Sequence, residues 1–505
     1  MDNSDMLAST KALMNPLILK LVLSYMDAPT LKSARSVCTL WADLGASLLA
    51  KQVSVTFTAE QCCRKEISKE LGSLDPKLTR SVILIMAPPP CCWISLPENF
   101  ATNLPHVSHH IVELDVTMSS KFVPALEQMW IMHHFPNLRQ LTITVVTIEV
   151  DDQDNSDLHD EEADVDVEFI AVTPKIPKFM ALPNLAFLKI VVSDRYDSGR
   201  DDGISSICQG LLNSASDILN VDIHASFFPD FTTCTNLEVL SYTLVQFLYN
   251  WVEEYGNVDM SKLTGMLDAC RNSLTGLTLS FPRDLENFAP VNFMLPSIPN
   301  LSVINIRKMY PLGNFLHPVN LPNLTHVTFS DYNSSCLSLT DIFQNFDLPH
   351  ERITSLDVEA FYTFFDTDVE TAAKIVRLFP SVTNFRLKLT VFDELNLPEM
   401  LQSFATWDLT SGLVEIESGQ KSTDLLAVLR GVVWWQGLAH TAVNFDVLES
   451  PKFVLDDEMK EILLLCRSLR WIKISGFRME EEERKKFEEF IEEHALQISL
   501  LNWVN

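Results

Sequence analysis

Residues 322–329, PNLTHVTF, contain the pattern that decides the fold of this chain. A Pro-Asn pair is followed by apolar residues at Leu324, Val327 and Phe329, with variable residues between them. Successive side chains of a strand point to opposite faces, so Val327 and Phe329, two residues apart, share the face that turns toward a core. A Pro-Asn pair is typical of a turn that leads the chain into such a strand. The segment therefore predicts a turn followed by a short strand.

The same apolar pattern recurs along most of the chain. Its copies are IVELDV (111–116), LRQLTI (138–143), LAFLKI (185–190), ILNVDI (218–223), LTGLTL (274–279), LSVINI (301–306), LTHVTF (324–329), ITSLDV (353–358), VTNFRL (382–387), AVNFDV (442–447) and LRWIKI (469–474). LEVLSY (237–242) is a weaker copy, and GLVEIES (412–418) is expected to hide another that lost its first apolar residue. From 274 to 382 the copies lie 27, 23, 29 and 29 residues apart.

Helical segments are predicted between the strands, for example PALEQMWIMHHF before Pro136 and TAAKIVRLF before Pro380. One strand and one helix cannot bury their own apolar faces, so such units must stack against one another. The organisation resembles a degenerate leucine-rich-repeat solenoid, or horseshoe. It is degenerate because the Asn or Cys expected a few residues after each strand is not regular. The resemblance implies an α/β repeat over residues 53–505; an irregular α/β domain is the alternative.

Two segments depart from the repeat. Residues 149–168 contain eleven acidic residues and no basic ones, which predicts a solvated, extended loop projecting from one repeat. The loop has side chains at calcium-loop spacing, but Ser156 stands where the sharp turn needs Gly. Two interpretations of the loop stay open: a flexible acidic segment that attracts a basic substrate, or an inert insertion. Residues of about 478–505 predict a C-terminal cap, in which a helix turns Phe487, Phe490 and Ile491 inward before a short strand.

The N-terminal part has a different, purely helical pattern, PLILKLVLSYMDAPTLKSARSVCTLW, from Pro16 to Trp41. Asn15 and Pro16 form a helix-start signal, and Pro29 ends this helix and opens a second. An apolar stripe then continues from Leu31 to about Leu49. A unit of this size cannot cover so much apolar surface alone, so a partner is expected.

The spacing of Met26-Asp27, Leu31, Val37-Cys38 and Trp41 resembles an F-box. The resemblance implies that residues 1–52 form an F-box-like helical module that docks on a Skp-type adaptor and, through it, on a cullin. By position, the adaptor-binding residues would be Pro16, Ile18, Leu21, Val22, Met26, Leu31, Val37 and Trp41. Many F-boxes begin with Leu-Pro and acidic residues, whereas this chain has MNPLIL, with Pro16 one place late. The alternative is an ordinary helical cap of a larger domain.

The charge of the chain excludes several kinds of partner. The net charge is −29, which repels phosphate backbones and anionic lipid surfaces, so no nucleic acid and no membrane partner is expected. Without a secretory signal or an apolar run long enough for a bilayer, we expect cytoplasmic or nuclear localisation with reduced cysteines.

No motif indicates catalysis, and we expect no catalytic residue, cofactor or metal. The histidines at 106, 109, 110, 133 and 134 lack ligand spacing. Trp434 and Trp435 predict a packing pair, or a substrate anchor if one of them is exposed. We expect the non-catalytic substrate-recognition subunit of a cullin-type E3 ubiquitin ligase, whose repeats bind an unknown substrate protein. The alternative is a leucine-rich-repeat interaction scaffold with no ubiquitin link.

Overall fold

The computed structural model describes residues 14–58, 76–86, 104, 107–146, 176–192, 201–245, 260–281, 294–307, 315–330, 338–362, 367–391, 397–418, 424–435, 440–447, 454–466, 472–475 and 479–501. The chain divides into two compact units. Unit 1 is Met1–Leu237 with Val245–Tyr255, and unit 2 is Glu238–Leu244 with Gly256–Asn505.

The described part of unit 1 starts with three short helices and continues as strands with intervening helices. The helices are α2 (Pro16–Ser24), α3 (Ala28–Ala34), α4 (Thr39–Leu49), η1 (Pro76–Leu78), η3 (Ser120–Phe122), α8 (Val123–Met132) and α9 (Asp201–Ser214). The strands are β1 (Val55–Thr58), β2 (Ser81–Met86), β3 (Glu113–Ser119), β4 (Gln140–Val146), β5 (Phe187–Val192) and β6 (Asn220–Ala225).

In the described residues of unit 2, strands alternate with helices except from β8 to β10, where no helix is described. Its strands are β7 (Val239–Leu244), β8 (Gly276–Ser280), β9 (Val303–Arg307), β10 (His326–Ser330), β11 (Ser355–Tyr362), β12 (Asn384–Val391), β13 (Ser411–Ser418), β14 (His440–Val447), β15 (Ile472–Ser475) and β16 (Ile498–Leu501). Its helices are α10 (Met260–Cys270), α11 (Leu339–Phe343), α12 (Thr367–Leu378), α13 (Leu397–Ser403), η6 (Phe404–Thr406), α14 (Asp424–Val432), α15 (Asp457–Leu465) and α16 (Glu481–Glu493).

Within each unit the strands form a parallel sheet in which each strand pairs with its neighbours in the chain. In unit 1 the order runs from β1 to β6, with pairs such as Leu114↔Leu141 and Leu141↔Leu188. In unit 2 it runs from β7 to β16, with pairs such as Val327↔Leu356 and Leu356↔Phe385. The chain is therefore α/β with an open, repeat-like parallel sheet, as the spacing of the copies predicts.

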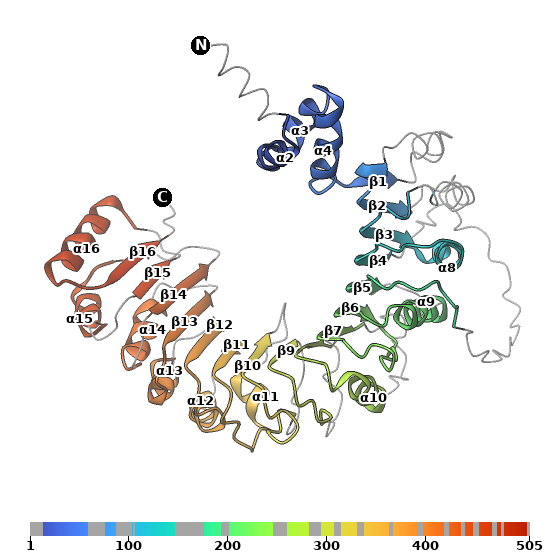
Figure 1. Ribbon diagram of the computed structural model, residues 1–505. Helices are drawn as coiled ribbons and strands as arrows, with labels where there is room; N and C mark the ends of the chain where they lie inside the picture. Colours follow the sequence, from blue (N-terminus) through green and yellow to red (C-terminus); the bar gives the residue numbers. More distant parts are fainter. Residues whose placement is uncertain are drawn as a thin grey trace, which may run out of the picture. The chain divides into compact units, whose positions relative to one another are not determined.

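The strands bury every second side chain against the helices. In β11, Leu356, Val358 and Ala360 are buried, whereas Asp357 and Glu359 between them remain partly exposed. The buried side chains of neighbouring strands meet aromatic rings from the helical side; Phe329 of β10 packs edge-to-face on Phe343 of α11. In unit 2 the helices α11 to α15 lie side by side along one face of the sheet (Figure 1). The opposite face, called the open face below, carries the partly exposed side chains.

The Asn of each Pro-Asn turn links one repeat to the preceding one. The side-chain amides of Asn137, Asn184, Asn300 and Asn323 donate to the main-chain oxygens of His109, Pro136, Asn272 and Pro299 at 2.6–2.8 Å. Each donor satisfies a carbonyl group that belongs to no strand ladder. A leucine-rich repeat is expected to carry an Asn after its strand, whereas in this chain an Asn before the strand connects the repeats.

Every copy predicted from the sequence is a strand in the structure. The strands from β3 to β12 begin two residues after the first apolar residue of their copy, whereas β14 begins two residues before its copy and β15 three residues after. The hidden copy at 412–418 is β13, which pairs with β12 and β14 over its whole length. The predicted terminal helix is α16, with Phe487 and Phe490 buried and Ile491 partly exposed, followed by β16. Strands β1 and β2 were not predicted. The acidic segment 149–168 lies outside the described residues.

Candidate functional site

The three N-terminal helices form a small module with a core of its own. Asn15 caps α2 by accepting a hydrogen bond from Leu17 N at 3.0 Å, and Pro16 occupies the first turn. Asp27 caps α3 in the same way through Thr30 N, beside Pro29. The predicted helix starts are therefore confirmed. Leu19 and Leu23 of α2 are fully buried against Leu31 of α3 and Leu48 and Leu49 of α4.

The opposite side of α2 is also apolar, but it is exposed. Leu17 is 79% exposed, Leu21 59% and Tyr25 83%, while Ile18 and Val22 beside them are exposed to smaller extents. Val37, in the turn between α3 and α4, is 63% exposed. A helix that is apolar all round is normally covered on all sides. These side chains, called the module face below, therefore form a surface suited to a protein partner.

The structure divides the eight residues that the F-box resemblance assigns to the adaptor. Pro16, Ile18, Leu21, Val22 and Val37 are exposed on the module. Met26 and Trp41 are partly buried and pack against the core. Leu31 is fully buried, so it lies in the core instead of the surface and acts by holding α3 against α2 and α4. The sequence pattern does not distinguish these roles, and it missed Leu17 and Tyr25, the two most exposed members of the face.

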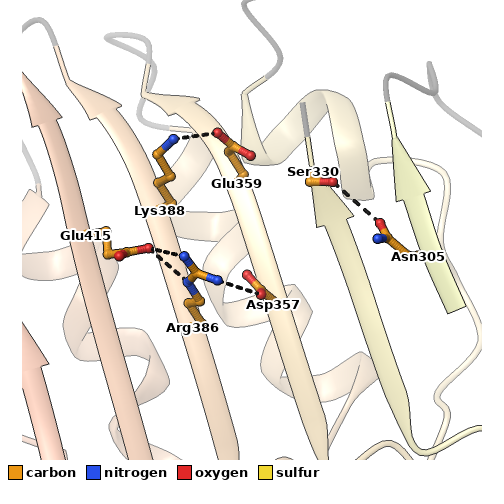
Figure 2. A network of polar contacts seen from close by, with 7 residues as sticks. All are labelled: Asn305, Ser330, Asp357, Glu359, Arg386, Lys388 and Glu415. Carbon is orange, nitrogen blue, oxygen red and sulfur yellow. Dashed lines mark hydrogen bonds and ion pairs between the residues drawn. The ribbon is translucent and has the colours of Figure 1, made fainter. Parts of the chain in front are cut away.

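A second candidate surface is a polar network on the open face of unit 2, shown in Figure 2. Arg386 of β12 lies between two carboxylates: its Nε and Nη2 donate to Glu415 Oε2 of β13 at 2.8 and 2.6 Å, and its Nη1 donates to Asp357 Oδ2 of β11 at 3.4 Å. Lys388, two residues further along β12, donates to Glu359 Oε1 at 2.8 Å. Ser330 of β10 donates to Asn305 Oδ1 of β9 at 3.4 Å.

The network follows directly from strand register. Asp357 pairs with Arg386, Glu359 with Lys388, and Lys388 with Glu415, so opposite charges face each other across adjacent strands. Partial burial raises the pKa of Asp357, an effect that the nearby Arg386 only partly offsets. The pKa of Arg386 is raised because its two carboxylate partners outweigh its own desolvation. Acids and bases are thus held in fixed positions on an exposed face, which suits recognition of a polar partner surface.

Unit 1 has a smaller network of the same kind. Lys189 Nζ lies 2.9 Å from Asp222 Oδ2, and His224 Nε2 lies 3.1 Å from Asp222 Oδ1. Burial opposes the charge of Asp222, but the hydrogen bonds and charges of His224 and Lys189 prevail and lower its pKa well below the ordinary value. In contrast, Asp115 of β3 has an Oδ1 atom without a hydrogen-bond partner, and partial burial raises its pKa.

The remaining sequence candidates lie apart from these surfaces. Trp435 is buried, and its Nε1 donates to Leu401 O at 2.8 Å, whereas Trp434 is 56% exposed. His133 is buried, His109, His110 and His134 are exposed, and His106 lies outside the described residues. Among the described residues, no group of three or more His, Cys, Asp or Glu side chains has the geometry of a metal site.

No family model matches the chain, and no curated protein matches it significantly. Of the helices in the described part of the chain, none combines the length and apolar character that a bilayer span requires.

Proposed function

We propose that the chain is the substrate-recognition subunit of a cullin-type E3 ubiquitin ligase. The F-box-like module docks on a Skp-type adaptor through the module face, and the open face of the repeats binds a substrate protein. The chain itself carries out no chemical step, because ubiquitin transfer in this arrangement is performed by other subunits and the receptor holds the substrate near them.

The observation that carries the proposal is the exposure of the module face. Leu17, Leu21 and Tyr25 expose most of their apolar surface although Leu19 and Leu23 of the same helix already fill a core. Burying a side chain of this size on association contributes about 1.5–3 kcal/mol. The F-box-like spacing of Met26, Leu31, Val37 and Trp41 supplies the class of partner.

The proposal is tested by co-expressing the full chain with a Skp-type adaptor and purifying the chain by affinity. We expect the adaptor to co-purify in equal amount. Leu21→Asp and Val37→Asp, each at an exposed position of the module face, are expected to reduce the retained adaptor at least tenfold, because a buried unpaired carboxylate opposes docking. Trp41 is a poorer choice because it packs on the module core.

Ser47→Asp is the matched control, because Ser47 is exposed on α4 and the change adds the same charge to the same module. Its adaptor binding should equal that of the unmodified chain. If the unmodified chain retains no adaptor, or if the module-face variants retain as much as the control, the adaptor proposal is wrong and the chain is an interaction scaffold without a ubiquitin link.

A further inference from the structure

A cavity of about 330 Å³ lies in unit 1 at the edge where strands β2 to β5 begin. Arg80 immediately precedes β2, Arg139 immediately precedes β4, and Val112 immediately precedes β3 between them. His109 and His110, in the turn before β3, complete one side of the cavity. The lining thus brings together two arginines and two histidines from three successive repeats.

Main-chain hydrogen bonds fix the positions of the two arginines. Arg80 O accepts from Val112 N and Glu113 N at 2.8 and 3.1 Å, and Val112 O accepts from Arg139 N and Gln140 N at the same two distances. Neighbouring strands lie about 4.8 Å apart, so the backbones of Arg80 and Arg139 are about 10 Å apart with the smaller Val112 between them. Two long cationic side chains at this separation can reach one anionic group from both sides.

Asparagine side chains hold the rest of the wall. Asn137 Nδ2 donates to His109 O at 2.7 Å, and Asn184 Nδ2 donates to Pro136 O at 2.6 Å. Both asparagines also line the cavity. The histidine turn is therefore fixed before any ligand arrives, which lowers the entropic cost of binding.

The charge of the cavity is opposite to that of the chain. Acidic residues outnumber basic ones by 67 to 38 in the whole sequence, yet no carboxylate lines the cavity. The side chains of Arg80 and Arg139 form no ion pair with any residue in the described part of unit 1 or unit 2. Two like charges that face one cavity without a carboxylate partner repel each other, and an anionic ligand would relieve this repulsion.

We propose that this cavity binds a phosphate monoester group. A guanidinium fork matches the oxygens of a phosphate in geometry as well as in charge, and the cavity volume falls in the usual range for small-molecule sites. The group belongs either to a free phosphorylated metabolite or to a phosphorylated side chain; both present the same dianion. The site is separate from the module face, so the proposal does not depend on adaptor binding.

The test is calorimetric titration of the full chain, without adaptor, using two probes. One is glycerol 3-phosphate beside glycerol, and the other is a short phosphoserine peptide beside its unphosphorylated form. We expect at least one phosphorylated probe to bind and neither unphosphorylated counterpart to bind. Arg80→Gln and Arg139→Gln are each expected to weaken binding about tenfold, because each removes a charge-assisted hydrogen-bond donor.

Arg377→Gln supplies the control, since Arg377 is exposed on α12 of unit 2 and the same charge is lost away from the cavity. This variant should bind the phosphorylated probe with the affinity of the unmodified chain. Arg139→Lys keeps the charge without the fork and should give an intermediate affinity, which provides a second variant if a Gln variant fails to fold. Preference for the peptide or for glycerol 3-phosphate identifies the source of the group. The proposal is overturned if neither phosphorylated probe binds. It is also overturned if the Arg80→Gln and Arg139→Gln variants bind the probe with the same affinity as the unmodified chain.

Discussion

At the scale of the residue, strand register determines which ion-pair partner a charged side chain on a strand can reach. Asp222 is the clearest case in unit 1, because it accepts from both Lys189 and His224 while mostly shielded from water. In this setting its carboxylate is favoured strongly over the protonated acid. Asp115, three strands away in the same sheet, has no such partner among the described residues. Burial therefore raises its pKa, whereas the pKa of Asp222 is lowered.

Asp222 should therefore stabilise the fold in a pH-dependent way. Its pKa in the folded chain lies well below the ordinary 3.8, so its contribution is fully present above that value and is lost as the pH falls through the folded pKa. We expect Asp222→Asn to lower the free energy of unfolding by roughly 1–3 kcal/mol at pH 7 and the difference to narrow below about pH 4. Urea unfolding between pH 3 and 7 measures both.

Glu113→Gln is the matched control, because Glu113 is an exposed carboxylate at the start of β3 in the same sheet. We expect it to change stability by less than about 0.5 kcal/mol. A loss of stability in Asp222→Asn that persists unchanged to the lowest pH would show that the side chain acts through packing and not through its charge.

At the scale of the element, adjacent helices of unit 2 approach closely where glycine permits it. Gly431 lies in α14, and a Cβ atom at this position would stand 2.5 Å from Leu401 Cβ and 3.0 Å from Pro398 O of α13. Gly265 lies in the interior of α10 with nothing within 4 Å of the corresponding position. The two glycines share a helical setting but differ in their surroundings.

The same substitution should therefore have opposite effects at the two sites. Alanine is favoured over glycine in a helix by about 1 kcal/mol, so Gly265→Ala is expected to stabilise unit 2 by up to that amount. Gly431→Ala is expected to destabilise it by about 1–3 kcal/mol, because α13 and α14 must move apart. Thermal unfolding of the two variants is the measurement, and stabilisation by both would mean that the helices separate without cost.

The elements also show what the sequence could predict. Strands with alternating apolar residues after a Pro-Asn turn, such as β4 and β10, were predicted because backbone geometry imposes the alternation. Strands β1 and β2 were missed because the first apolar position of the pattern is polar in both, Gln52 before β1 and Thr79 before β2. The open-face network was not predictable, since Arg386 meets Glu415 only through the register of β13, the copy with the weakest pattern. The cavity depends in the same way on β2, which places Arg80 beside Val112.

The module illustrates a different limit. The stripe of apolar residues predicted the helices and a need for a partner, and the starts of α2 and α3 were readable from Asn15 and Pro29, although the capping role of Asp27 was not predicted. Spacing alone does not tell which apolar face of α2 turns inward, because the helix is apolar nearly all round. Spacing likewise does not tell which side chains of α3 turn inward, and the resemblance placed Leu31 on the expected interface although it fills the core.

At the scale of the whole molecule, one segment, residues 149–168, supplies eleven of the 29 excess acidic charges. Residues 149–168 lie between β4 and β5, yet these two strands pair directly from Gln140↔Phe187 to Val145↔Val192. Pairing of the strands therefore does not require the acidic residues between them. Segments that connect neighbouring strands generally tolerate insertions and deletions with little change in stability.

We expect deletion of residues 151–166 to shift the melting temperature by no more than about 2 °C, because few native contacts should be lost. Differential scanning calorimetry of the deleted and complete chains measures the shift. A matched control replaces the same residues with a Gly-Ser segment of equal length, which separates the effect of charge from that of length. A drop of many degrees in both variants would show that the segment packs against the fold.

Within each unit, the pairing of strands that are neighbours in the chain has a consequence for synthesis. In unit 2, β8 follows β7 and β9 follows β8 in both sequence and space, so each new strand emerging from the ribosome finds its partner already made. No strand must wait for a distant one, because contacting repeats are separated by roughly the same short length of chain. The unit can therefore assemble while translation continues, with only the most recently made strand edge open to misfolding or to chaperones.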